Sequence, residues 1–341
     1  MKFRNREAWQ IENDALRVTV LRGGGHIAEI LDKRTGVNPL WVPPWPSIEP
    51  AEYSPDQDTC YGRNVESRLL AGIMGHNLCL DTFGPPSEDQ LRAGISVHGE
   101  APIAQYQGEV HGGELHVSAT LPFSQLRVRR SMRLSECDTK VHFRESVENL
   151  LSIDRAIAWT QHVTLGPPFL QAGDTQLHVD AQRSRVFEKE GFDAGDLVRG
   201  ADFTWPKAPT RSGGESDLST FASGGSPARF TTHLLDRRAP TVSFTAYSRA
   251  HELVFGYEWK PRDFPWIGIW EENRSRTSPP WNGNTVACGM EFGVSPFPET
   301  NADMVLRGSL FTVPAFRTLR AREQVTVRYS AFFLSAPPVR S

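Results

Sequence analysis

Apolar and polar residues alternate with a period of two along much of this chain, and that pattern constrains its fold more than any other feature. Leu16–Leu21 reads LRVTVL, and residues 324–334 read QVTVRYSAFFL. No long stretch carries apolar residues at the 3.6-residue spacing of an amphipathic helix. Because side chains alternate between the two faces of a strand, the pattern predicts strands with one buried face. We therefore expect an all-β protein, a large and mostly antiparallel sandwich.

Short turns join several of these predicted strands. Residues 109–121 divide into two strands at Gly112 and Gly113, a pair typical of a hairpin. Leu126–Leu134 and residues 140–147 are separated by a short polar turn. Such connections favour antiparallel neighbours, and the lack of a fixed-period repeat argues against a propeller or a solenoid.

A chain of 341 residues fits one large domain or two ordinary ones. Two irregular stretches interrupt the strand pattern: residues 43–58, rich in proline and acids, and residues 212–227, rich in glycine and serine. The second is a candidate linker between domains. Strand patterning is similar on both sides of it, so we favour a single domain over residues 1–341 with two long surface loops.

Charge and composition exclude several partners. The formal net charge is −3 and there is no basic run, so nucleic acid is not an expected partner. No stretch approaches the ~18 apolar residues of a membrane span, and the N-terminus lacks the apolar region of a signal peptide. The 4 cysteines stand singly, without the spacing of a zinc site. We expect a cytoplasmic protein.

The first candidate for chemistry is SVHGE at residues 96–100. In an extended strand His98 would share a face with Ser96 and Glu100. Such a polar cluster fits a ligand site. On this segment alone, a structural histidine beside the turn at Gly99 is the favoured interpretation.

The second candidate is AWTQHVTL at residues 158–165. Alternation puts its large apolar residues on one face and His162, between Thr160 and Thr164, on the other. A site on a concave sheet needs a polar face of this kind. A solvated surface has the same composition, so both interpretations stay open.

The third candidate is VACGMEFGV at residues 286–294, where Gly289 and Gly293 flank Glu291 on its own face. Glycines inside a strand often mark the close approach of a ligand or of another backbone. The pattern predicts room for a substrate above the Glu291 carboxylate. The alternative is that the glycines mark bulges and that Glu291 pairs with a surface arginine.

The fourth candidate is FPWIGIWEEN at residues 264–273, with Trp281 shortly after it. Trp266 and Trp270 share one face of this predicted strand. Tryptophan offers a flat apolar platform for a sugar ring, although the core of a sandwich also accommodates tryptophan.

Two other reaction classes lack specific signals. A glycosidase needs two carboxyl groups facing one bond, and the adjacent Glu271 and Glu272 point to opposite faces. Pairing Glu291 with Glu100 or Asp81 remains open. A zinc or iron centre needs histidine or carboxylate ligands. The chain has such residues, but not at the spacing usual for a metal site. Its candidate ligands are His76, His98, His162 and Glu291.

Fingerprints of other enzymes are missing as well. The chain has no GxSxG and no GxxxxGK[ST], and its glycine triplet precedes a strand-like segment instead of a helix. We expect no cofactor and no bound metal.

Several segments, taken in order, carry a common resemblance. They are LRVTVLRGGGHIAEILDKRTGVNPLW at 16–41, VHGEA at 97–101, SVENLLSIDRAIAWTQHVTLGPPFL at 146–170 and VACGMEFGVSPFPE at 286–299. Together they resemble the aldose 1-epimerase (galactose mutarotase) superfamily. The resemblance implies a galactose mutarotase-like β-supersandwich with a sugar on its concave face, and an isomerase that interconverts anomers.

The resemblance also implies roles for three residues. Glu291 matches the general base that takes the proton from the anomeric hydroxyl, and His162 the general acid that protonates the ring oxygen. His98 matches the histidine that orients the sugar. For His162 to be protonated near neutral pH, its pKa must stay near ~6.5 or above, which a nearby carboxylate favours.

The chain departs from the family at two places. An Asn-Arg motif is usual upstream of the HG motif, and here residues 75–81 place His76 and Asp81 where that arginine is expected. The second histidine is followed by Val163-Thr164-Leu165 instead of an aromatic pair. The expected sugar-binding residues are His98, His76, Asp81, Glu100, Trp266, Trp270 and Trp281.

Two further functions stay open beside the mutarotase. One is a carbohydrate-binding protein of the same fold without catalysis. The other is a metal-dependent sugar isomerase or lyase that uses the histidines.

Overall fold

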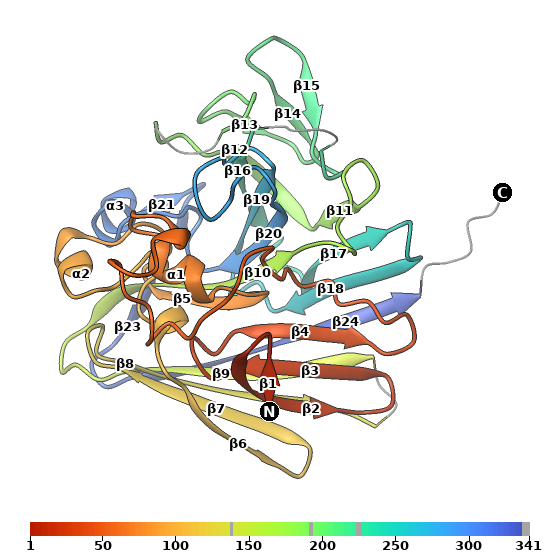
Figure 1. Ribbon diagram of the computed structural model, residues 1–341. Coiled ribbons are helices and arrows are strands. Elements are labelled where there is room, and N and C mark those ends of the chain that lie inside the picture. Colours follow the sequence, from red (N-terminus) through yellow and green to blue (C-terminus); the bar gives the residue numbers. More distant parts are fainter. Residues whose placement is uncertain (137–138, 191–193, 223–226, 336–341) are drawn as a thin grey trace.

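The computed structural model describes residues 1–136, 139–190, 194–222 and 227–335. Strands dominate this part of the chain, and the named strands pair antiparallel, which confirms the all-β prediction. Two large sheets form the body of the molecule (Figure 1). No helix in the described ranges is long and apolar enough to cross a membrane.

The larger sheet has 12 strands and carries the candidate site. Its main path runs β1 (Lys2–Phe3), β2 (Arg6–Glu12), β3 (Leu16–Leu21), β4 (Ile27–Asp32), β5 (His76–Asp81), β10 (Arg155–Leu165), β20 (Val286–Gly293), β19 (Trp266–Asn273), β16 (Arg229–Leu235), β12 (Ala181–Val186) and β13 (Asp202–Phe203). A further strand, β23 (Arg317–Leu319), pairs with the start of β10.

The smaller sheet has 8 strands. It runs β11 (Gln176–Val179), β17 (Val242–Ser248), β18 (Leu253–Trp259), β24 (Gln324–Ser335), β9 (Lys140–Asn149), β8 (Leu126–Leu134), β7 (Glu114–Leu121) and β6 (Gln107–His111). Two small hairpins complete the strands: β14 (Lys207–Pro209) with β15 (Glu215–Asp217), and β21 (Ser309–Leu310) with β22 (Val313–Pro314).

Helices are short and lie outside the sheets. They are α1 (Ser67–Gly72), α2 (Glu88–Arg92) and α3 (Asn301–Arg307), with 3-10 turns at Thr59–Tyr61 and Ala101–Ile103. Figure 1 shows the three α-helices together at one side of the larger sheet, next to β5 and β10. Helices of one or two turns carry too few residues for a 3.6-residue period to stand out in the sequence.

The predicted strands recur with close bounds. β3 and β8 match the predicted segments, residues 324–334 fall within β24, and β6 and β7 meet at Gly112 and Gly113, both with positive φ. Residues 43–58 are irregular, as predicted. The stretch 212–227 is not a loop throughout, because β15 lies in it; its residues 223–226 fall outside the described ranges.

The main core lies between the two sheets and draws on both. From β10, Trp159 and Val163 point into it. A charged network is buried there as well: Arg130 Nε donates to Glu145 Oε2 at 2.6 Å, and Glu145 Oε1 accepts from Trp159 Nε1 and Gln161 Nε2 at 2.7 and 2.6 Å. The network therefore holds the core-facing side of β10, and His162 lies on the opposite side of this strand.

Candidate active site

The sheet register brings His162 and Glu291 together. They are direct partners across β10 and β20, and both side chains point away from the core between the sheets. His162 Nε2 lies 3.1 Å from Glu291 Oε1, and both side chains are buried. On the other side of the ring, His162 Nδ1 lies 3.1 Å from the hydroxyl of Thr164. A carboxylate and an imidazole in contact can exchange a proton.

The glycines of β20 make room for protein side chains. A Cβ on Gly289 would lie 2.3 Å from Glu291 Oε1, so the carboxylate folds back over this glycine. A Cβ on Gly293 would lie 2.4 Å from Thr160 Oγ1. Across the sheet, Gly268 is the register partner of Glu291, and the ring of Phe230 fills the space above Gly268. The space that the sequence suggested for a substrate is thus partly taken by Glu291 itself.

Replacing Gly289 with alanine is expected to displace the Glu291 carboxylate without unfolding the chain, because the atom in the way ends a flexible side chain. With Glu291 as a catalytic group, a misplacement of about 1 Å costs about 10²-fold in rate, so that role predicts a loss of this order in kcat. Steady-state kinetics of Gly289→Ala, Glu291→Gln and the double variant test this. If the double variant is much slower than Glu291→Gln alone, Gly289 acts by another route.

His98 enters the site from a turn and not from a strand. Its φ is 70°, and Gly99 follows with φ 85°. Ser96 and Glu100 therefore do not share a strand face with it. The ring of His98 lies 4.9 Å from the ring of His162, centroid to centroid. Its Nδ1 is buried and has no hydrogen-bond partner among the described residues. Left-handed conformations of residues with side chains are uncommon and cluster at functional sites.

Burial sets the protonation of this group. It lowers the pKa of His162 to about 4, against a smaller opposing effect of a backbone hydrogen bond. It raises the pKa of Glu291 well above its ordinary value and lowers that of His98. The expectation that a carboxylate keeps the pKa of His162 near ~6.5 is therefore wrong, because loss of solvent dominates. Both shifts favour the uncharged forms of the two side chains, an arrangement with a single proton on the pair.

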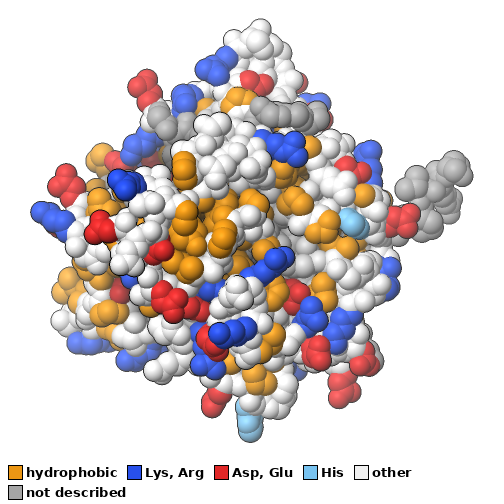
Figure 2. All heavy atoms as spheres, viewed as in Figure 1, with side chains coloured by type: hydrophobic (Ala, Val, Ile, Leu, Met, Phe, Trp, Pro, Cys, Tyr) orange, Lys and Arg blue, Asp and Glu red, His pale blue; other side chains and the backbone are white. Residues whose placement is uncertain are grey.

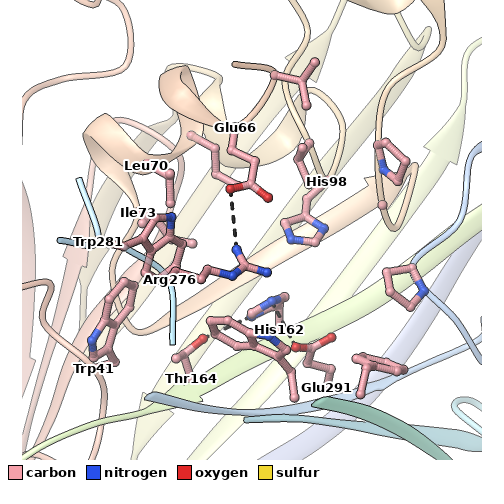
Figure 3. Close-up of a pocket in the computed structure, with 18 residues that line it drawn as sticks. Trp41, Glu66, Leu70, Ile73, His98, His162, Thr164, Arg276, Trp281 and Glu291 are labelled. Carbon is pink, nitrogen blue, oxygen red and sulfur yellow. Dashed lines mark hydrogen bonds and ion pairs between the residues drawn. The ribbon is translucent and has the colours of Figure 1, made fainter. Parts of the chain in front are cut away.

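These residues line a cavity of about 270 Å³. Of the residues that the sequence analysis selected, His98, His162, Trp270, Trp281 and Glu291 line it. Further lining residues that the sequence analysis did not select include Trp41, Glu66, Leu69, Leu70, Ile73, Thr164, Phe230 and Arg276. Figure 3 shows Arg276 reaching into the cavity between Glu66 and His162. Of these additional residues, Thr164 alone could have been predicted from the sequence, because it shares a strand face with His162.

Arg276 is held by charge and by aromatic faces. Its guanidinium lies 5.4 Å from the ring centroid of Trp270 and 4.9 Å from that of Trp281. It also forms ion pairs with Glu66 at 3.5 Å and with Glu272 at 3.7 Å. The cation at this cavity is thus balanced by two carboxylates.

His76 lies on the opposite face of β5, inside the core. Its Nδ1 is 3.0 Å from the Tyr257 hydroxyl and its Nε2 is 2.9 Å from Gln161 Oε1. Strand alternation explains this. Asn77 is the register partner of His162, and His76, the residue before it, points to the opposite face of the sheet. The structure therefore does not bring His76 to the cavity.

Three other selected residues also lie elsewhere. Asp81 forms an ion pair with Arg155. Glu100 accepts hydrogen bonds from the backbone and the hydroxyl of Ser124, both at 3.0 Å. Trp266 is buried and donates to the Pro314 carbonyl at 3.1 Å, beneath the β21–β22 hairpin. Each of these side chains forms an ion pair or hydrogen bonds with a neighbouring segment and does not line the cavity.

Within the described ranges, no group of three or more His, Cys, Asp or Glu residues is placed to hold a metal ion. The four candidate ligands named from the sequence are divided by β5, since His76 faces the core while the other three line the cavity.

Comparisons with protein-family models and with curated protein sequences give no match. Solved structures do match. A galactose mutarotase-like protein from Clostridium acetobutylicum has a TM-score of 0.62 at 12% identity, covering 98% of this chain and 97% of its own. One from Lactobacillus casei has a TM-score of 0.60 at 14% identity, with 96% and 100% covered. A galactose mutarotase related enzyme from Lactobacillus acidophilus has a TM-score of 0.58 at 12% identity, with 97% and 99% covered.

These similarities extend over nearly the whole of each chain, at identities that speak for the fold alone. They confirm the predicted fold. The chain therefore has the galactose mutarotase-like fold, a large antiparallel β-supersandwich.

Proposed function

We propose that this protein is a sugar mutarotase, an isomerase of the aldose 1-epimerase type. The observation that carries the proposal is the contact of His162 Nε2 with Glu291 Oε1 at 3.1 Å in a cavity that His98 also lines. Ring opening of an aldose needs one group to remove a proton and another to supply one. A carboxylate and an imidazole in one enclosed site supply both.

The reaction follows from these groups. The Glu291 carboxylate takes the proton of the hydroxyl on C1, and the electrons of that O–H bond form the C1 carbonyl. The bond from C1 to the ring oxygen breaks, and His162 gives its proton to that oxygen. Rotation about the bond from C1 to C2 and the reverse steps produce the other anomer. His98, beside His162, is the group that orients the ring oxygen.

The single shared proton meets the needs of this reaction. Burial favours the proton on Glu291, and the reacting form is the tautomer in which that proton has moved to His162 and Glu291 is a carboxylate. Sugar hydroxyls then replace the direct contact between the two side chains. Trp270 and Trp281, which line the same cavity, offer apolar faces to the carbon side of the ring.

The pH dependence of kcat/KM tests this proton count. We expect a plateau above about pH 4 that ends only at the raised pKa of Glu291, because the pair keeps one proton over that interval. Activity should fall as the pH drops towards about 4, where a second proton joins the pair and Glu291 can no longer act as base. It should fall again at high pH, when the shared proton leaves. An inflection of the acid limb near ~6.5, the ordinary pKa of histidine, would contradict a buried pair; circular dichroism at each pH controls for unfolding.

The second candidate is a carbohydrate-binding protein without catalysis. One observation favours it: His162 and Glu291 satisfy each other directly, so the pair needs no substrate to be stable. Polarimetry on freshly dissolved anomers separates the two functions. A mutarotase accelerates the change in rotation, whereas a binding protein leaves the spontaneous rate unchanged while sugar still binds.

A further inference from the structure

The cavity is polar where Glu291, His162 and His98 line it and apolar over much of the rest. Figure 3 shows Trp41, Leu70, Ile73 and Trp281 gathered at the side away from Glu291. In Figure 2, hydrophobic side chains gather near the middle of the visible face. A substrate bound for reaction at Glu291 therefore extends towards an apolar wall.

This apolar wall is firmly built. Leu69 and Leu70 come from α1, and the Ile73 N–H donates to the Leu69 carbonyl at 2.8 Å. The rings of Trp41 and Trp281 stack with centroids 6.2 Å apart and planes 12° apart. Interlocked aromatic and aliphatic groups of this kind leave a sugar hydroxyl few hydrogen-bonding partners, so placing one there is unfavourable. An apolar substituent gains from the same contact.

The charges beside the wall disfavour an anionic substrate. Arg276 is the cationic side chain among the residues named for the cavity, and it is already paired with Glu66 and Glu272. A phosphate or carboxylate on the substrate would have to compete with two carboxylates fixed in the protein. A neutral substrate avoids that repulsion.

We propose that the substrate is a neutral aldose with an apolar substituent on a carbon other than C1, such as a 6-deoxyhexose or a 6-O-acylhexose. This inference rests on the proposed mutarotase function, because C1 must keep its free hydroxyl to react. The reacting edge of the ring lies at His162 and Glu291. The substituent lies against Trp41, Leu70 and Ile73.

Anomer exchange on matched sugars tests the inference. The panel is galactose and glucose, each with its 6-deoxy, 6-O-butanoyl and 6-phosphate derivative. The 6-deoxy sugar replaces a hydroxyl with hydrogen and the butanoyl ester adds methylene groups. In an apolar pocket either change is worth about 10-fold or more in kcat/KM, so both derivatives should exceed the parent by that factor. The 6-phosphates should be the poorest substrates.

Two variants tie the preference to the wall. Ile73→Thr puts a hydroxyl into it and should reduce the apolar preference several-fold. Ile95→Thr is the matched control: Ile95 is buried to a similar extent in the same apolar cluster but does not line the cavity, so the preference should stay. Loss of the preference in the control would mean that the wall is not its source.

The outcomes separate the inference from the function. Turnover without a preference for the apolar derivatives, or best turnover of a 6-phosphate, overturns the inference and leaves the mutarotase in place. If no sugar reacts, tryptophan fluorescence titration decides: tighter binding of the apolar derivatives supports the ligand class and overturns the mutarotase. If there is no turnover and the apolar derivatives do not bind more tightly, both the inference and the proposed function are overturned.

Discussion

Replacing Glu291 with glutamine is expected to lower kcat for anomer exchange by about 10²–10⁴-fold, the contribution of a positioned general base. The amide has the size of the carboxylate and fits over Gly289, so the fold and the cavity are kept. It cannot take the proton of the C1 hydroxyl. Sugar affinity should change little, because the apolar walls and His98 are untouched. Exchange kinetics and isothermal titration calorimetry measure the two quantities separately.

Glu29→Gln is the matched control for this variant. Glu29 is a buried carboxylate in the same large sheet, bonded to Arg17 and Thr19, and it does not line the cavity. Its replacement should leave kcat unchanged. If Glu291→Gln keeps the activity of the unmodified protein, Glu291 is not the base.

The second large effect is on stability. Glu145→Gln leaves the Arg130 guanidinium buried in the core without its carboxylate partner. Breaking a buried ion pair on one side costs about 3–5 kcal/mol, and we expect the free energy of unfolding to fall by that amount. Urea denaturation followed by circular dichroism measures it. Because Glu145 also binds Gln161, next to His162, activity should be lost at a lower temperature in this variant.

A double variant shows whether the unpaired charge is the cause. Combining Arg130→Met with Glu145→Gln removes both charges and keeps an amide oxygen that can accept from Trp159 and Gln161, so much of the lost stability should return. A loss below about 1 kcal/mol in Glu145→Gln would show that the pair is not important for stability.

Alternation along strands carried most of what the sequence could predict. It separated His162 from the core residues of β10 and Glu291 from Met290 and Phe292. Both side chains therefore lay on the face that the structure gives them. Their contact depends on the register of β10 with β20, which joins residues far apart in the chain and leaves no local signal.

Two cavity residues that the sequence did not reveal come from irregular segments. Arg276 follows β19, and Trp41 precedes the irregular stretch 43–58. No periodicity tells which side chains of a loop turn inward. Both Trp281 and Trp266 were predicted to bind sugar because they are tryptophans, but the β21–β22 hairpin covers Trp266. Residue type alone does not distinguish a tryptophan that lines a cavity from one buried in the core.

Selection by position in a motif had a similar weakness. His76 and Asp81 were selected because an arginine is expected there in the family that the sequence resembles. The structure shows that a one-residue step on β5 decides between core and cavity, and His76 falls on the core side. Asp81 lies on the other face, but its carboxylate forms an ion pair with Arg155.

The most direct test of a mutarotase at the His162–Glu291 pair is anomer exchange at equilibrium, followed by NMR exchange spectroscopy on a panel of aldoses with the unmodified protein. We predict exchange between the α and β signals well above the spontaneous rate for at least one neutral aldose, with no added metal or cofactor. Exchange at the spontaneous rate for every sugar that binds would contradict the proposed function and leave a binding protein with the mutarotase fold.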